Sequence, residues 1–146
     1  MAKRTAAVTW TGGLLDGKGM IESSGSGALG ALPVTWLSRA ESSDGKTSPE
    51  ELIAAAHASC FAMALSMLLA DGGTPPDELD VRSTVTFIPG TGITKSELEL
   101  GGRVLGLNEE AFRAKAEQAK TNCPVSQALK GLEITLAVKS FEPAAA

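Results

Sequence analysis

The stretch from Leu52 to Ala70 constrains the fold most, because it contains no Asp, Glu, Lys or Arg. It is long enough to suggest a membrane-spanning helix. It is also rich in alanine, includes a histidine and two serines, and follows Ser48-Pro49-Glu50-Glu51, which supplies an N-cap, a helix-starting proline and acid in the first turn. We therefore predict a core helix of a soluble protein from residue 49. A helix that is apolar nearly all round needs cover on more than one side, by a sheet or by a partner subunit.

The other patterns predict strands on both sides of this helix and shorter helices near the end of the chain. The first third has turn signals between apolar runs, and residues from Leu79 onward alternate between apolar and polar side chains. Asn108 is a helix N-cap, and a second, short helix follows Thr121 or Asn122. The expected strands are 5–10, 14–22, 31–39, 79–88, 93–107 and 134–141. This order gives a single α+β domain spanning residues 1–146, which we expect to be an obligate homodimer.

Composition excludes several classes of partner. The 146 residues include 13 basic and 17 acidic side chains, for a formal charge of −4, and no basic run is longer than Lys3-Arg4. This balance argues against a nucleic-acid partner. The N-terminal residues lack the apolar run of a secretory signal, so we expect a cytoplasmic protein that does not enter a membrane.

The two cysteines, Cys60 and Cys123, are candidates for chemistry. They are too far apart in the sequence for a C-x-x-C motif or a close pair of metal ligands, so only the fold could bring them together. A disulfide would need Cα atoms roughly 4.4–6.8 Å apart. The alternative is two buried thiols that act as small hydrophobic groups. In a reducing compartment, two reactive cysteines would favour catalysis or sensing over a structural disulfide.

Cys60 would need activation, because only the thiolate attacks a peroxide. It lies about three turns into the predicted helix, beyond the reach of the helix dipole, and apolar neighbours would raise its pKa. Arg39, at the end of the third predicted strand, is the candidate cation, and an arginine facing a buried site needs a carboxylate partner. Glu50 is the freer candidate, since Glu51 is placed to complete a capping box with Ser48. The ordinary alternative is that Arg39 is a surface charge and Glu50 compensates the helix dipole.

His57 and Cys123 offer further possibilities. His57 precedes Cys60 by three positions and could share its helix face, which suggests a Cys–His nucleophile for acyl transfer. No Asn or Asp partner for His57 is identifiable, and two cysteines with a single histidine are too few for a zinc site. Cys123, near a helix N-terminus, would ionise readily and could attack a sulfenic acid on Cys60.

The stretches SPEELIAAAHASCFAMALS and NCPVSQAL resemble the two signature stretches of the OsmC/Ohr family of hydroperoxide reductases, more closely the OsmC branch. The resemblance implies an intertwined α+β homodimer with two active sites at its interface. It implies that Cys60 is peroxidatic, Cys123 is resolving, and Arg39 with Glu50 is the activating pair. The expected substrates are organic hydroperoxides, with hydrogen peroxide as a further candidate, and the expected reductant is a dithiol such as a dihydrolipoyl group. No metal, haem or flavin is expected, and the setting would be osmotic and oxidative stress.

Two other functions remain open from the sequence. A non-catalytic redox sensor or stress-response binding protein could use the same cysteine pair as a switch, and it would oxidise once and stop. A Cys–His hydrolase would require His57 and would not require Cys123.

Overall fold

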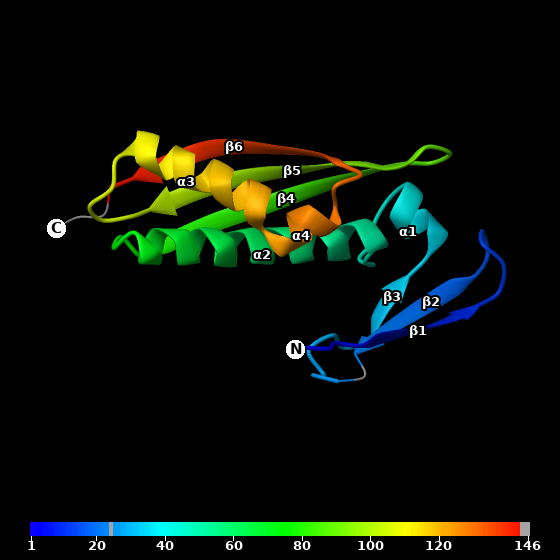
Figure 1. The fold of residues 1–146 in the computed structure, drawn as a ribbon. Helices are drawn as coiled ribbons and strands as arrows, with labels where there is room; N and C mark the ends of the chain where they lie inside the picture. The colour runs from blue at the N-terminus through cyan, green and yellow to red at the C-terminus, as the bar shows by residue number, and fades with distance from the viewer. Residues whose placement is uncertain (24, 144–146) are drawn as a thin grey trace. The chain divides into compact units, whose positions relative to one another are not determined.

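The protein is described by a computed structural model that covers residues 1–23 and 25–143 (Figure 1). The chain divides into two compact units, Met1–Leu52 and Ile53–Ala146. Each unit contains one three-stranded sheet, and helices lie between the strands along the chain. This arrangement confirms the predicted α+β class.

The first unit begins with an antiparallel meander. Strand β1 covers Ala6–Thr11, β2 covers Lys18–Ser23 and β3 covers Leu32–Val34, and they pair in the order β1-β2-β3. Both pairings are antiparallel, as expected for strands that are joined by turns. The predicted meander is therefore confirmed, with a third strand much shorter than the sequence suggested.

The segment after β3 is a helix and not the continuation of a strand. Helix α1 covers Trp36–Ala40, so the prediction that Arg39 ends the third strand is wrong. The reason is a reciprocal cap: the Thr35 hydroxyl accepts from the Ser38 backbone N–H at 3.0 Å, and the Thr35 backbone N–H donates to the Ser38 hydroxyl at 2.9 Å. Because serine replaces the usual Glu or Gln of this motif, the sequence pattern did not reveal the helix.

The long apolar helix starts where its sequence predicts. Helix α2 covers Pro49–Asp71, and the Ser48 hydroxyl accepts from the Glu51 backbone N–H at 3.1 Å. The Glu51 carboxylate accepts from the Thr47 hydroxyl at 2.6 Å, so its side chain is engaged just before the helix. At the other end, Gly73 adopts a φ of 85°, a conformation that side chains disfavour.

The second unit is built on a mixed sheet. Strands β4, Glu78–Ile88, and β5, Gly92–Arg103, form an antiparallel hairpin. Strand β6, Glu133–Glu142, pairs parallel to β5. The connection that a parallel pair requires is made by helices α3, Glu109–Asn122, and α4, Pro124–Ala128. Asn108 caps α3 as predicted, accepting from a backbone N–H at 2.8 Å.

One face of this sheet holds the core. On β5, Leu98 and Leu100 point into a cluster that contains one side of α2 and the apolar side of α3. The α2 side chains in the cluster recur every four residues, at Phe61, Leu65 and Leu69. Figure 1 shows α2 running along the sheet in this unit. The core therefore fixes α2, which carries Cys60, beside the segment from α3 to α4, which carries Cys123.

The opposite side of α2 is exposed in the single chain, and the expected cover by a partner subunit stays a prediction. Met63 is 71% exposed and Met67 is 59% exposed, since the sheet covers only the other side. By length and composition alone, α2 could also cross a membrane. The side packed on the sheet and the uncovered apolar side are opposite stripes of one helix.

Gly102 on β5 lies close to α3, so a substitution there tests the packing between these two elements. A Cβ atom at this position would lie 2.3 Å from the ring of Phe112, which is fully buried. We expect Gly102→Ala to lower the free energy of unfolding by about 1–3 kcal/mol, because the ring must move within a close-packed core. Urea unfolding measures this change. Gly131→Ala is the matched control, since nothing lies within 4 Å of its added Cβ. Equal stability of the two variants would contradict this account of the core.

Candidate active site

The fold brings the two cysteines together. The Cys60 thiol forms a side-chain hydrogen bond with Cys123, although the residues come from different helical segments. Cys123 is fully buried and Cys60 is partly exposed, and both are free thiols. The pair therefore joins a partly exposed cysteine to a fully buried one.

The surroundings of Cys60 favour its neutral form. Burial is the largest cause that raises the pKa of the Cys60 thiol, as the apolar sequence context predicted. The hydrogen bond with Cys123 and the electrostatic effect of that second thiol raise the pKa further. Formation of the Cys60 thiolate therefore requires a favourable charge that the surrounding apolar groups do not supply.

A backbone amide partly opposes these effects, and the sequence did not point to it. The Val125 N–H donates a hydrogen bond to the Cys60 sulfur, which lowers the pKa of Cys60. Val125 belongs to the first turn of α4, where backbone N–H groups lack partners within the helix. Pro124 at the start of α4 was the available signal, because proline at the first helical position marks such a turn.

Cys123 lies at the junction of two helices. The sequence suggested that Thr121 or Asn122 would cap the short helix, but α3 continues through Asn122 and Cys123 itself occupies the N-cap position of α4. Its backbone N–H donates to Ala119 at 2.9 Å, which closes the end of α3. The cysteine is thus held by the backbone of both helices.

Arg39 and Glu50 form an ion pair within the first unit. Two nitrogens of Arg39 contact the same oxygen of Glu50: Nε lies 2.9 Å and Nη2 lies 2.8 Å from Oε1. The Glu50 side chain is 8% exposed and that of Arg39 is 29% exposed. The other oxygen, Oε2, is buried and has no hydrogen-bond partner among the described residues. Glu50 is therefore the carboxylate that contacts Arg39, whereas Glu51 accepts from the Thr47 hydroxyl.

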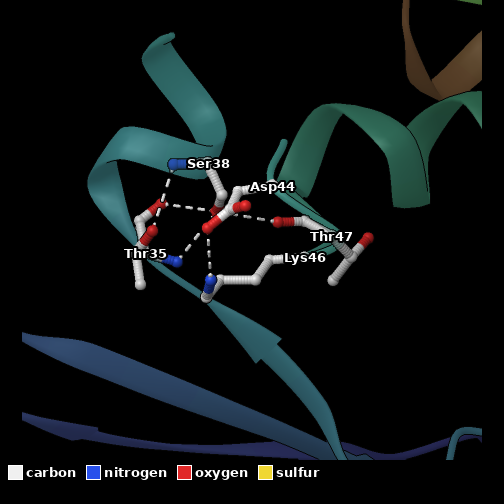
Figure 2. Close-up of polar contacts among 5 residues, drawn as sticks. All are labelled: Thr35, Ser38, Asp44, Lys46 and Thr47. Atoms are coloured by element: carbon white, nitrogen blue, oxygen red, sulfur yellow. Dashed lines mark hydrogen bonds and ion pairs between the residues drawn. The ribbon is translucent and has the colours of Figure 1, made fainter. Parts of the chain in front are cut away.

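Polar contacts around Ser38 hold the segment that carries Arg39. Figure 2 shows the Ser38 hydroxyl between Thr35 and Thr47, and it donates to the Thr47 carbonyl at 3.1 Å. Lys46 and Asp44 form a further ion pair at 3.3 Å in the same loop. These contacts connect α1 to the loop before α2, so that Arg39 and Glu50 are held on adjoining segments.

A cavity of about 420 Å³ lies beside Arg39 within the first unit. Its walls are mostly apolar, and they include Val8, Trp10, Ile21 and Trp36. A cavity with hydrocarbon walls and one cationic group suits a ligand that is apolar with a small polar end.

His57 is buried but it is not arranged as a base for Cys60. Its Nδ1 lies 2.6 Å from the Ser96 hydroxyl and its Nε2 lies 2.8 Å from the Ser126 hydroxyl. Burial lowers the pKa of His57. With both ring nitrogens occupied by serines, the geometry does not support the Cys–His hydrolase. Ser126 could have been suspected from its place three residues after Cys123, and Ser96 from its alternation with buried leucines.

The described residues contain no group of three or more His, Cys, Asp or Glu side chains arranged to hold a metal ion.

The fold and the paired thiols define a class of small α+β proteins with two neighbouring cysteines. Within that class, the chain belongs to the OsmC-like protein family, whose model matches residues 42–138. It is 42% identical to the peroxiredoxin OsmC of Escherichia coli strain K12 over 130 residues, covering 87% of this chain and 89% of that protein.

Solved structures agree with the family. The organic hydroperoxide resistance protein OhrB of Bacillus subtilis is similar with a TM-score of 0.69 and 27% identity, covering 92% of this chain and 98% of that one. The organic hydroperoxide resistance protein OsmC of Legionella pneumophila has a TM-score of 0.67 and 26% identity, covering 97% and 99%. The resemblance read from the two cysteine motifs is therefore confirmed.

Replacing Cys123 should make Cys60 more acidic. Cys123→Ala removes both the hydrogen bond and the second thiol that raise the pKa of Cys60, while the Val125 N–H remains. We expect the pKa of Cys60 to fall, and the inflection of its alkylation rate to move to lower pH. Iodoacetamide labelling of Cys60 across a pH series measures this shift. An inflection that stays in place or moves to higher pH would contradict the described thiol contact.

Proposed function

We propose that this protein is a thiol-dependent peroxidase that reduces organic hydroperoxides to alcohols. The observation that carries the proposal is the contact between a partly exposed Cys60 and a buried Cys123. The names of the relatives support it, since they include a peroxiredoxin and organic hydroperoxide resistance proteins. Hydrogen peroxide is a further candidate substrate.

Cys60 is the proposed peroxidatic residue. Its thiolate attacks the distal oxygen of the hydroperoxide, the O–O bond breaks, and the alkoxide takes a proton and leaves as alcohol. Cys60 is then a sulfenic acid. This assignment is supported by its partial exposure, because the substrate must reach the sulfur.

Cys123 is the proposed resolving residue. Its thiol condenses with the Cys60 sulfenic acid, so that a disulfide forms and water leaves. A dithiol such as a dihydrolipoyl group then exchanges with this disulfide, returning both cysteines to thiols and becoming a cyclic disulfide itself. The burial of Cys123 supports this role, since the hydroperoxide would meet Cys60 first.

The Arg39–Glu50 pair is the proposed source of activation. A guanidinium beside Cys60 would favour the thiolate and bind the peroxide oxygens by charge-assisted hydrogen bonds. The support is the family resemblance, together with a carboxylate that holds the Arg39 side chain through two contacts. The unsatisfied Oε2 of Glu50 could accept a hydrogen bond from the O–H of the hydroperoxide.

The cavity beside Arg39 supports a preference for hydroperoxides with an apolar group. Its volume is about 420 Å³, and its apolar walls would stabilise a hydrocarbon chain or aromatic ring. Hydrogen peroxide would gain none of this burial. We expect a lower KM for an apolar hydroperoxide than for hydrogen peroxide.

A homodimer in the cytoplasm is the proposed setting, with residues 1–146 acting as one domain. The exposed apolar side of α2, which includes Met63 and Met67, supports cover by a second subunit, since apolar patches on soluble proteins mark interaction sites. Light scattering that gave the mass of two chains would agree with the dimer. The mass of one chain would exclude it.

Turnover of cumene hydroperoxide with dihydrolipoamide tests the activity. The wild-type protein should complete many cycles, which separates a peroxidase from a sensor that oxidises once. We expect Cys60→Ser to abolish turnover, because a hydroxyl cannot be oxidised to a sulfenic acid. Cys123→Ser should still consume hydroperoxide in a first cycle and then accumulate over-oxidised Cys60. Full activity of the folded Cys60→Ser variant would reject the proposal.

Arg39→Ala tests the source of activation. Loss of the guanidinium should raise the pKa of Cys60, because an opposite charge no longer favours the thiolate. The pH dependence of Cys60 alkylation, measured in the Cys123→Ala background, reports Cys60 alone. Arg113→Ala is the control, since Arg113 forms an exposed ion pair with Glu109 on α3. An Arg39→Ala profile that matches the control would remove Arg39 from the proposed site.

A further inference from the structure

His57 is a buried polar residue that the proposed reaction does not use. It continues the fully buried row of α2 side chains that includes Phe61 and Leu65, so a polar ring stands where the pattern calls for an apolar one. Neutral histidine has one ring N–H donor and one acceptor, and each needs a partner when it is buried. Serine hydroxyls from two other elements supply both partners.

These hydrogen bonds connect three elements. Ser96 lies on β5 and Ser126 lies on α4, while His57 lies on α2. Ser83 on β4 continues the chain, with its hydroxyl 3.0 Å from that of Ser96. His57, Ser96 and Ser126 are each at most 5% exposed, so the bonds are shielded from competing water. Burial lowers the pKa of His57 and keeps the ring in the neutral form that this arrangement uses.

The bond between His57 and Ser126 spans the same two helical segments as the thiol contact. His57 precedes Cys60 by three residues on α2, and Ser126 follows Cys123 by three residues into α4. Each end of the bond is therefore about one helical turn from a cysteine. The Val125 N–H, which donates to Cys60, is part of the same turn of α4.

We propose that His57 and Ser126 are positioning residues, whose hydrogen bond holds α4 against α2 so that Cys123 stays in reach of Cys60. The inference deepens the proposed function, because the bond it concerns would favour closure of the Cys60–Cys123 disulfide over further oxidation of Cys60. When two reacting groups are already held in contact, the step that forms the disulfide no longer carries the entropic cost of bringing them together.

The thiol–disulfide equilibrium with glutathione tests this role without a hydroperoxide. Two protein thiols and one oxidised glutathione give the Cys60–Cys123 disulfide and two reduced glutathiones. Full-length protein is equilibrated over a series of glutathione ratios, free thiols are trapped with N-ethylmaleimide, and mass spectrometry gives the disulfide fraction. We expect Ser126→Ala to lower the equilibrium constant about tenfold, which is about 30 mV for this two-electron couple.

Two variants of His57 show whether the change in the equilibrium constant comes from the bond to Ser126 or from the bond to Ser96. The shorter His57→Asn retains a group near Nδ1 for Ser96 but does not reach Ser126, so it should behave like Ser126→Ala. His57→Gln places its amide near Nε2 and should stay within about threefold of the wild type. The double variant with Ser126→Ala and His57→Asn should show no further loss, because both changes remove the same bond.

Ser140→Ala on β6 is the matched control, since this exposed serine takes no part in the His57 contacts. An equilibrium constant for folded Ser126→Ala that stays within about twofold of the wild type would overturn the proposal. If Ser126→Ala does not fold, His57→Asn is judged by the same limit. Lower thermal stability with an unchanged equilibrium would show a structural role only, which also overturns it. Failure of wild-type peroxide turnover would reject the proposed function and leave this test unaffected.

Discussion

The contact between the Cys60 and Cys123 thiols is the interaction on which the proposed chemistry of this protein depends. It exists because α2 and the segment from α3 to α4 pack on the same face of one sheet. The same contact has a cost, since burial and the neighbouring thiol raise the pKa of Cys60 and favour its unreactive form. Proximity and activation therefore make opposite demands on this site, and they must be met by different groups.

Different parts of the chain contribute to proximity and to activation. The second unit brings the thiols together and adds the Val125 amide and the His57 hydrogen bonds. The first unit supplies an oriented cation, since Glu50 holds the Arg39 side chain and the contacts around Ser38 hold the helix that carries Arg39. In the proposed reaction, the cation acts in the first step, when a thiolate is needed. The contact acts in the second step, when a disulfide closes.

The sequence predicted the elements that local signals define. Ser48 and Asn108 marked helix starts, and the alternation after Leu79 marked a strand pair. It missed α1, because Ser38 completes the cap in place of Glu or Gln. It also could not show which side of α2 is covered, since apolar residues lie all around that helix. The cysteines were recognised from their motifs, whereas the Ser96 and Ser126 partners of His57 depend on tertiary contacts between distant segments.

The most direct test is the intact mass of the protein after one equivalent of cumene hydroperoxide, followed by dihydrolipoamide. The account predicts the loss of two hydrogens as a Cys60–Cys123 disulfide, reversed by the dithiol and repeated over several cycles. Fragment masses would place the bond between these two residues. Two unchanged free thiols after the hydroperoxide would contradict the account, because the contact between the sulfurs would then have no part in peroxide reduction.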